Sequence, residues 1–542
     1  MQEIACDYVV VGAGSAGCAL AYRLAQSGRH KVVLVEAGGR DSSVWIHMPL
    51  GIGYLLQNER YMWKFETEPE AALGGQRIYW PRGKVIGGSS AVNGMVYAWG
   101  EAAEYDAWRD AGNAGWGFDD LLPYFMRMET YPYPSPAPRG KSGPVRITNR
   151  GLRDPDPLSD AFLAGCIEAG IPATEDYNDG RADGASYLQQ TAWRGRRWTT
   201  ATAYLKPARR LANFTLLTNA LATRILFEGK RATGVEFRKD GATGRVLARG
   251  EVVLCAGTVQ SPQLLEVSGV GRPEVLGACG VDVHHALAGV GENLQDHLQV
   301  RLTYHCSRPL TINDILNSRF HAARAGLRYL LLRKGLLAST SSSVHALART
   351  RPDLARPDVK LQIAHISGKD RYSRAPGTGV DEHSGFALGL FKLHPKSRGS
   401  CHITSPDTAV APAMRANYLA DPEDGETIVR GMELIRRIAE APSMRPMIVA
   451  EKRPGPAVSG ADELLAYVRQ TGQTSWHPIS TCRMGSDEAA VVDAKLRVRG
   501  IDRLRIADCS IMPTMASSNT NAPAIMIGEK GADLVLADAS SR

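Results

Sequence analysis

The sequence contains no uncharged apolar run of the roughly 18 residues that a membrane-spanning helix requires. Its nine cysteines are scattered and include no Cys-x-x-Cys pair, so we expect neither a disulfide framework nor a zinc or other metal site. The first expected strand begins at about Cys6, which leaves no room for a secretory signal peptide. These absences predict a protein of the reducing cytoplasm, with peripheral contact at the inner membrane face as an alternative.

Strong charge of one sign is also missing. The chain has 64 basic and 56 acidic residues, and the resulting net charge of +8 is dispersed. Dispersed charge favours solubility and weak attraction to anionic surfaces. Because no nucleic-acid motif accompanies it, we expect no nucleic-acid partner. With 542 residues, 44% of them hydrophobic, the chain is long enough for two or more domains around sizeable cores.

Only one complete dinucleotide fingerprint is present, and it lies near the N-terminus. Residues 8–11 predict a short strand, residues 12–17 have the pattern Gly-x-Gly-x-x-Gly, and residues 18–25 predict a helix. A lone glycine pattern is weak evidence, because it also occurs in glycine-rich turns that bind nothing. The flanking strand and helix make dinucleotide binding the better interpretation.

Each glycine of this loop has a separate expected role. Gly12 permits a tight turn, Gly14 lets the backbone approach a pyrophosphate, and Gly17 lets helix and strand pack closely. The free N–H groups at the start of the helix would then face the phosphates. Glu36 ends the second expected strand, 19 residues after Gly17, where a carboxylate accepts hydrogen bonds from an adenosine ribose.

Further strands and helices follow the fingerprint. Residues 216–228 and 234–237 predict strands, and residues 251–257 predict a buried strand that ends in glycine. Ser261-Pro262 predicts the N-cap and first-turn proline of a helix over residues 263–267. Because strand, glycine turn and helix recur, we predict an α/β fold (α+β over the whole chain) around a Rossmann-like sheet.

The middle of the chain has a different character. Residues 300–455 carry strand and helix patterns without a nucleotide signature, so we expect them to shape the substrate side. Asp421 predicts the N-cap of a helix with an apolar stripe of Ile428, Met432, Ile435 and Ala439. A basic helix within residues 319–337 has the stripe Phe320, Ala323, Leu327 and Leu330. We expect that helix to pack on its own domain, with contact to a membrane surface as the alternative.

The predicted domains are discontinuous, because a strand ending at Ala507-Asp508 could add to the first sheet. We predict a Rossmann-like, dinucleotide-binding domain of residues 1–155, 200–300 and 458–542. A second, sheet-plus-helices domain of residues 156–199 and 301–457 would bind the substrate.

Five segments in this order resemble the glucose–methanol–choline (GMC) family of FAD-dependent oxidoreductases, over essentially the whole chain. They are the fingerprint with Glu36, residues 83–93, residues 257–271, residues 291–297, and the two C-terminal segments that contain His477 and Asn519. The resemblance is closest to choline-dehydrogenase-like bacterial alcohol dehydrogenases.

This resemblance implies FAD as the cofactor, in agreement with the single complete fingerprint. It places Gly12 to Gly17 at the pyrophosphate, Glu36 at the ribose, the backbone of Ala222 at the adenine, and Asp508 near the ribityl–pyrophosphate region. The other residues that it places at the cofactor are Ser15, Ala16, Ala37, Trp63, Arg82, Val85, Asn93, Gly94, Met95, Val96, Trp476, Ala507, Asn519 and Thr520. Some relatives bind flavin covalently through a histidine at the position of Asn93, and an amide cannot form that link. We therefore expect non-covalent FAD.

Alcohol oxidation by a flavin removes a hydroxyl proton and transfers a hydride from the same carbon. A histidine titrates in the range that a base needs, and an asparagine can steer the hydroxyl by hydrogen bonds. His477 matches the family's catalytic histidine, and Asn519 matches a second position that is His or Asn across the family. Asn521, two residues further on, is the alternative to Asn519. We expect Asp296 and His297 to be structural.

The resemblance implies the FAD-dependent oxidation of a primary alcohol to an aldehyde. The electrons would pass to a quinone, another carrier or oxygen. Two alternatives stay open at this point: a lyase on the same scaffold, since plant hydroxynitrile lyases belong to this family, and a non-catalytic flavoprotein. The sequence leaves the alcohol undecided among choline and aliphatic, aromatic, furanic and polyether alcohols, and it does not predict an oligomeric state.

Overall fold

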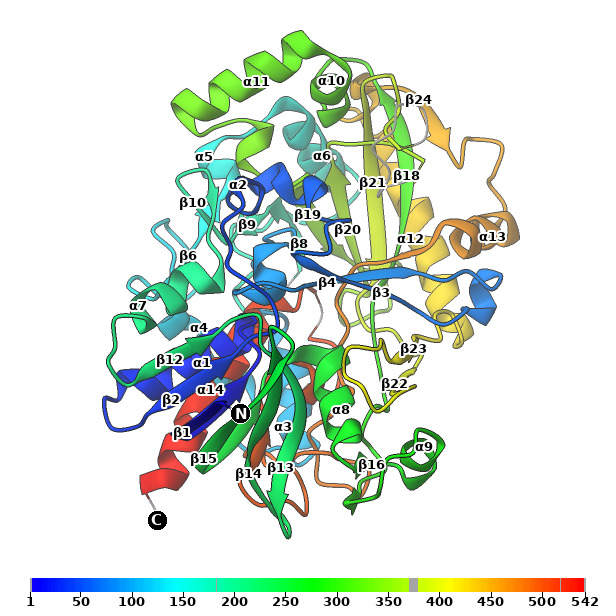
Figure 1. Cartoon of the computed structure of the whole chain (residues 1–542). Helices are drawn as coiled ribbons and strands as arrows, with labels where there is room; N and C mark the ends of the chain where they lie inside the picture. The colour runs from blue at the N-terminus through cyan, green and yellow to red at the C-terminus, as the bar shows by residue number, and fades with distance from the viewer. Residues whose placement is uncertain (1, 182, 370–378, 517, 541–542) are drawn as a thin grey trace.

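The computed structural model describes residues 2–181, 183–369, 379–516 and 518–540, and it contains two large sheets (Figure 1). The first is seven-stranded. Its strand order is β12 (Phe214–Leu217), β2 (Val32–Val35), β1 (Gln2–Val11), β15 (Ala242–Leu254), β14 (Arg231–Lys239) and β13 (Leu221–Glu228), with β26 (Leu504–Ile506) also paired to β15. Parallel pairing joins β12, β2, β1, β15 and β26, whereas β13 and β14 add as antiparallel strands.

The centre of this sheet is buried on both faces, which explains its continuous apolar runs. All four residues of β2 are buried, and so are Val9, Val10 and Val11 of β1. Helix α1 (Ser15–Gln26) packs against the long C-terminal helix α14 (Asn521–Ser540), and Figure 1 shows the two side by side. A Cβ atom on Gly528 of α14 would lie 2.3 Å from the Ala16 carbonyl oxygen, so glycine is needed at this crossing.

The second sheet is antiparallel and also seven-stranded. Its order is β24 (Ile448–Arg453), β18 (Leu298–Cys306), β21 (Gly385–Lys392), β20 (Val359–Ala364), β19 (Ser342–Ala348) and β8 (Gly184–Tyr187), and β25 (Gln473–Thr474) pairs with β18. Helix α12 (Pro422–Glu440) packs on this sheet, capped by Asp421 as predicted. Its predicted stripe is buried in a second core that also contains residues of α6 (Pro157–Glu168) and α13 (Ala461–Thr471).

Shorter elements surround the two sheets. The remaining helices are α2 (Val44–His47), α3 (Ala102–Asp110), α4 (Phe118–Met128), α5 (Arg150–Arg153), α7 (Lys206–Ala208), α8 (Gly257–Val267), α9 (Pro273–Ala278), α10 (Ile312–Asn317) and α11 (Arg319–Leu332). The two-stranded sheets are β3 (Met62–Glu66) with β4 (Tyr79–Gly83), β5 (Glu129–Thr130) with β6 (Val145–Arg146), β7 (Thr148–Asn149) with β9 (Gln189–Gln190), β10 (Ala192–Trp193) with β11 (Arg196–Arg197), β16 (Val270–Gly271) with β17 (His285–Ala286), and β22 (Ser400–His402) with β23 (Ala413–Arg415).

The predicted fold class is confirmed, and the strand at residues 504–506 joins the first sheet as expected. The structure also contains two separate cores, one under each sheet. The residue boundaries of the two domains stay a prediction.

Helix α8 corrects one expectation, because it begins at Gly257 and contains Pro262 instead of starting at it. A proline has no N–H to donate to the carbonyl four residues earlier. That carbonyl, on Thr258, instead accepts a hydrogen bond of 2.6 Å from the Thr481 hydroxyl. Ser261 does not cap the helix either, since its hydroxyl donates to Asp508. A side chain from the C-terminal region thus satisfies the carbonyl that the proline leaves free.

Two other expectations are also wrong in detail. The single strand predicted over residues 216–228 is two strands, β12 and β13, and they lie at opposite edges of the first sheet. The apolar stripe of the basic helix near residues 319–337 does not pack on its own domain: Phe320, Leu327 and Leu330 of α11 are exposed.

Candidate active site

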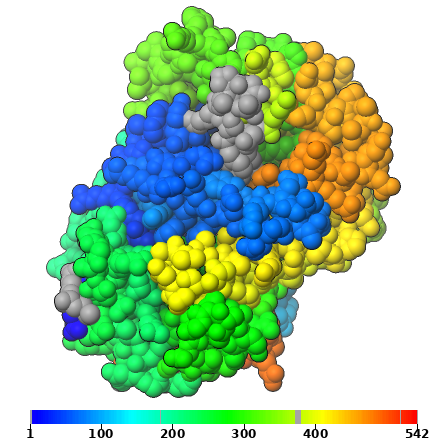
Figure 2. Space-filling model, turned by 45° about the vertical axis from the view of Figure 1, so that its right-hand side comes forward, coloured from blue at the N-terminus to red at the C-terminus, as the bar shows by residue number. Residues whose placement is uncertain are grey.

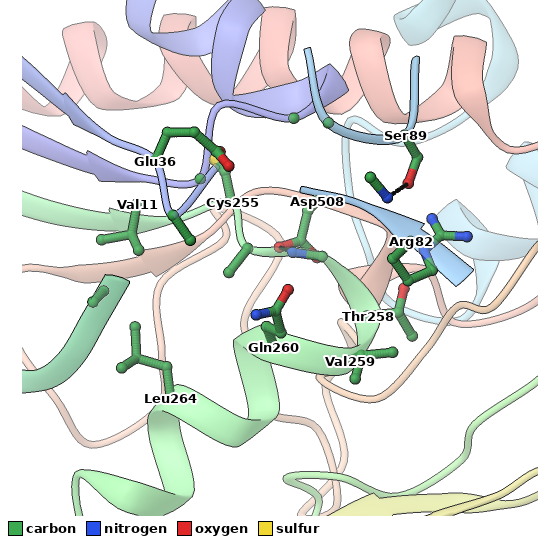
Figure 3. A pocket seen from close by; sticks show the side chains of 18 of the residues that line it. Val11, Glu36, Arg82, Ser89, Cys255, Thr258, Val259, Gln260, Leu264 and Asp508 are labelled. Atoms are coloured by element: carbon green, nitrogen blue, oxygen red, sulfur yellow. Dashed lines mark hydrogen bonds between the residues drawn. The ribbon is translucent and has the colours of Figure 1, made fainter. Parts of the chain in front are cut away.

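A cavity opens at the carboxyl ends of β1, β2 and β15, where the crevice of an α/β sheet normally binds its ligand. It encloses about 1060 Å³ of space not filled by protein atoms, which is large for a ligand site. Figure 3 shows Val11, Glu36 and Cys255 at the strand ends, α8 along one side, and Arg82 and Ser89 beyond it. The predicted residues among its lining are Gly12, Gly14, Ser15, Ala16, Glu36, Ala37, Trp63, Arg82, Ala222 and Asp508.

The glycines form a loop with no room for side chains. A Cβ atom on Gly12, whose φ is +102°, would lie 2.5 Å from the Cys255 carbonyl oxygen, and one on Gly17 would lie 1.9 Å from the Gly12 carbonyl oxygen. Gly88 is as tight, since its Cβ would lie 2.7 Å from the Cα atom of Gly14. No side chain caps the start of α1, so its first N–H groups stay available to phosphate oxygens. The loop therefore fits the pyrophosphate of a dinucleotide.

Glu36 is fixed at the end of β2 by two backbone amides. Its carboxylate accepts hydrogen bonds from the N–H groups of Ala13, at 2.8 Å, and Gly38, at 2.7 Å. Burial nevertheless raises the pKa of Glu36 to about 7, which shows how little water reaches the group. Its carboxylate lies where a ribose hydroxyl of a dinucleotide would add a further hydrogen bond.

Asp508 joins the end of β26 to the start of α8. It accepts hydrogen bonds from the N–H of Gly257, at 2.9 Å, from the hydroxyl of Ser261, at 2.6 Å, and from the N–H of Ser510, at 2.8 Å. These contacts set the position of the cavity wall that α8 provides.

A second group of predicted residues lies beyond Arg82. The guanidinium of Arg82 lines the cavity and donates to the carbonyl oxygen of Trp476 at 3.0 Å, which places the cavity next to His477. Asn93 is held by Arg197, which donates to both its carbonyl oxygens at 2.6 and 3.0 Å. The predicted residues that do not line the cavity are Gly17, Val85, Asn93, Gly94, Met95, Val96, Trp476, Ala507, Asn519 and Thr520.

His477 belongs to a chain of four side chains whose hydrogen bonds have only one consistent arrangement. Lys360 Nζ lies 2.6 Å from Asn519 Oδ1, and Asn519 Nδ2 lies 2.8 Å from His477 Nε2. His477 Nδ1 lies 2.9 Å from His297 Nδ1, and His297 Nε2 lies 2.9 Å from the Leu393 carbonyl oxygen.

The donors follow from the two ends of this chain. A carbonyl oxygen can only accept, so His297 donates from Nε2 to Leu393 and, being neutral, accepts at Nδ1. His477 must then donate from Nδ1, which leaves its Nε2 as the acceptor. At the other end, the Asn519 oxygen accepts from Lys360, so its Nδ2 donates to the same His477 Nε2. Both directions assign one neutral tautomer to His477, with its basic nitrogen beside Asn519.

The surroundings hold both histidines neutral. Burial lowers the pKa of His297 to about 3. Burial also lowers the pKa of His477 well below its ordinary value, and His297, Lys360 and Arg82 act in the same direction. The ring of His477 lies edge-on to Phe391, with ring centroids 5.7 Å apart.

Asp296 and His297 differ in what they do. Asp296 Oδ1 accepts from the backbone N–H of His477 at 2.7 Å, and its other oxygen accepts from Thr474, so it anchors the loop as expected. His297, which was expected to be structural, contacts the His477 ring directly.

Sequence reasoning missed several residues that the structure brings to the site. Lys360 had no signal, because a lysine in an apolar strand resembles an exposed position. Gly257 and Thr258 line the cavity, and their signal was the strand–glycine–helix pattern. Cys255, Cys482 and Cys509 were expected to be packed thiols; burial raises the pKa of all three, that of Cys509 to about 12.

Fold and site together define a dinucleotide-binding protein with a buried histidine base. The GMC oxidoreductase family model matches residues 6–299 with its N-terminal part and residues 395–528 with its C-terminal part. The chain therefore belongs to the GMC oxidoreductase family. Within the described residues, no helix could cross a bilayer, and no group of three or more His, Cys, Asp or Glu could hold a metal ion.

Full-length relatives agree with this assignment. The chain is 40% identical over 532 residues to an oxygen-dependent choline dehydrogenase of Photobacterium profundum, covering 98% of this chain and 93% of that one. It is 39% identical to the protein of the same name from Brucella anthropi, covering 98% and 95%. The crystal structure of pyridoxine 4-oxidase from Mesorbium loti superimposes with a TM-score of 0.88 at 32% identity, covering 97% and 98%. A formate oxidase variant from Aspergillus oryzae, at 24% identity, shares the fold with a TM-score of 0.92 over all of both chains.

The chain is thus an FAD-dependent oxidoreductase that oxidises alcohols, as the resemblance implied. The lyase and the non-catalytic flavoprotein find no support among these relatives, whose names are those of dehydrogenases and oxidases.

Proposed function

We propose that His477 is the base that takes the hydroxyl proton of a primary alcohol, and that Asn519 positions that hydroxyl. FAD, when bound, supplies the acceptor for the hydride that leaves the same carbon. The product is an aldehyde. This assigns the proton to Nε2 of His477, the nitrogen that the hydrogen-bond chain leaves unprotonated.

The observation that carries this proposal is the pairing of a donor and an acceptor at one point. Asn519 Nδ2 carries hydrogens, and His477 Nε2 carries a lone pair, 2.8 Å away. A hydroxyl group is complementary to this pair, since its oxygen can accept from the amide while its hydrogen is donated to the imidazole. As the proton moves to Nε2, the His477 ring becomes cationic, and the Nδ1 hydrogen bond to His297 holds the ring in place.

The cofactor residues proposed for this chain are those of the resemblance. The tight glycine loop and the uncapped start of α1 support a pyrophosphate site at residues 12–17. Asn93 supports non-covalent attachment, because an amide held by Arg197 offers no nucleophile to the flavin. We further propose that the first sheet belongs to the FAD-binding domain and the second sheet to the substrate-binding domain.

The substrate and the electron acceptor are proposed more broadly. Relatives named choline dehydrogenase and pyridoxine 4-oxidase support small primary alcohols as a class. A quinone, another carrier or oxygen would accept the electrons. We propose a cytoplasmic location with peripheral contact at the inner membrane face.

A panel of alcohols tests the proposal. Choline and aliphatic, aromatic, furanic and polyether alcohols would be added anaerobically to the purified protein, and the flavin absorbance near 450 nm followed. We expect at least one class to bleach the flavin and form an aldehyde, with the colour restored by air or a quinone analogue. Cleavage of a cyanohydrin without bleaching would contradict the proposal.

A further inference from the structure

Lys360 is a fully buried lysine without a carboxylate partner. It lies on β20, is 0% exposed, and forms no ion pair within the part of the chain that the structure describes. Its ammonium donates to Asn519 Oδ1 at 2.6 Å and to the Ser518 hydroxyl at 3.0 Å. A buried cation is normally paired, so an unpaired one next to a reacting centre calls for a functional reason.

The groups around Lys360 do not compensate its charge. Lys360 contributes to lowering the pKa of His477, His297 and His345, which places it near all three rings. Arg82 adds a second cation near His477. The nearby carboxylate of Asp296 is already engaged by the His477 backbone and by Thr474.

We propose that Lys360 determines substrate specificity by making the alcohol end of the site favour neutral or anionic alcohols over choline and other quaternary ammonium alcohols. The inference rests on the proposed function of His477 and Asn519. Like charges a few ångströms apart in a buried site repel strongly. A quaternary ammonium needs an aromatic cage or a carboxylate, whereas Lys360 offers it a positive charge at the group that positions the hydroxyl.

Three primary alcohols of similar shape and different charge test this proposal. They are choline, its neutral isostere 3,3-dimethylbutan-1-ol, and the anion 3-hydroxy-2,2-dimethylpropanoate. We expect the wild-type kcat/KM for flavin reduction to be at least about tenfold lower for choline than for the neutral alcohol. In Lys360→Met this ratio should fall toward one, whereas a purely structural role would lower the rate for all three alcohols alike.

A choline preference in the wild-type protein, or an unchanged ratio in Lys360→Met, would overturn the proposal. Lys360→Arg, which keeps the charge, should keep the ratio and serves as the matched control. The difference spectrum of the bound flavin, titrated with each alcohol in His477→Ala, gives the same comparison as a binding constant. Failure of the proposed function looks different, because then no alcohol of the wider panel bleaches the flavin.

Helix α11 carries a second, independent observation: its apolar face points to solvent. Phe320 is 72% exposed, Leu327 58%, Leu330 67% and Leu331 72%, whereas the buried face that attaches the helix is formed by Tyr329. In Figure 1 the helix lies at the outer edge of the molecule, and in Figure 2 the green segment that contains it projects at the top. An apolar stripe of this size on a surface helix marks an interaction site.

Charge surrounds this stripe. The helix has no acidic residue, and Arg319, Arg324 and Lys334 form no ion pair within the described residues. On a helical wheel, Arg319 lies on one side of the stripe and Arg324 on the other. Apolar residues flanked by arginines are typical of helices that lie in the interface of an anionic bilayer.

We infer that α11 docks the protein on an anionic lipid surface, with Phe320, Leu327 and Leu331 entering the acyl boundary. The holoenzyme should co-sediment with vesicles containing 30% phosphatidylglycerol and at least about tenfold less with pure phosphatidylcholine vesicles. Leu327→Asp with Leu331→Asp should abolish binding, and Val283→Asp, at an exposed position far from α11, should not. Equal binding of the α11 variant, or a dimer in gel filtration that this variant dissociates, would contradict the inference.

Discussion

Replacement of His297 by leucine should slow the reaction without emptying the cofactor site. The His297 ring is 0% exposed, and its Nδ1 is the acceptor for the Nδ1–H of His477. Leucine has a similar volume but no acceptor, so the His477 donor would be buried without a partner. It would also lose the group that holds its ring when a proton reaches Nε2.

The size of the effect follows from this lost hydrogen bond. A buried donor left without a partner costs about 1–3 kcal/mol. If the cost falls mainly on the transition state, the rate of flavin reduction should decrease about 5- to 150-fold. FAD content should match the wild type, because His297 does not line the cavity at the fingerprint.

Anaerobic stopped-flow reduction of the bound flavin by a saturating alcohol measures this rate. The double variant His297→Leu/His477→Ala provides the control, since His297 is argued to act only through His477. Its rate should equal that of His477→Ala alone. A wild-type rate in His297→Leu, or multiplying losses in the double variant, would refute the reasoning.

Three further predictions concern the cofactor loop and stability. Gly17→Ala should yield protein with less than about a tenth of the wild-type FAD, measured by absorbance after purification, because its Cβ has no room; a fully yellow variant would contradict this. Thr481→Val should lower the free energy of unfolding by about 1–3 kcal/mol in urea titration, because the Thr258 carbonyl loses its only donor besides water; an unchanged midpoint would contradict this. Burial lowers the pKa of His402, but Glu266 and a second carboxylate raise it to about 9 overall. The stability it contributes is therefore present below about pH 6.5 and is lost as the pH rises through 9, so His402→Gln should lower Tm more at pH 6 than at pH 10.

Local patterns predicted the first sheet well. A β-branched run, a glycine fingerprint and a carboxylate 19 residues later are interactions within one βαβ unit, so their spacing along the chain determines the geometry. The cap at Asp421 and the stripe on α12 are local in the same sense.

The parts that sequence reasoning missed depend on contacts between distant segments. The start of α8 was misplaced because Thr481, more than 200 residues away, satisfies the carbonyl that Pro262 leaves free. Lys360 and His297 meet Asn519 and His477 only because the second sheet lies against the C-terminal segment. The outward stripe of α11 could not be recognised either, since periodicity shows that a helix has an apolar face and not what that face contacts.

The most direct test of the account is the anaerobic reduction of FAD in His477→Ala by an alcohol that the wild type oxidises. Because the basic nitrogen is lost while the fingerprint stays intact, we expect a yellow protein with normal FAD content and a reduction rate at least about 10²-fold lower. A variant that reduces its flavin at the wild-type rate would show that His477 does not take the proton.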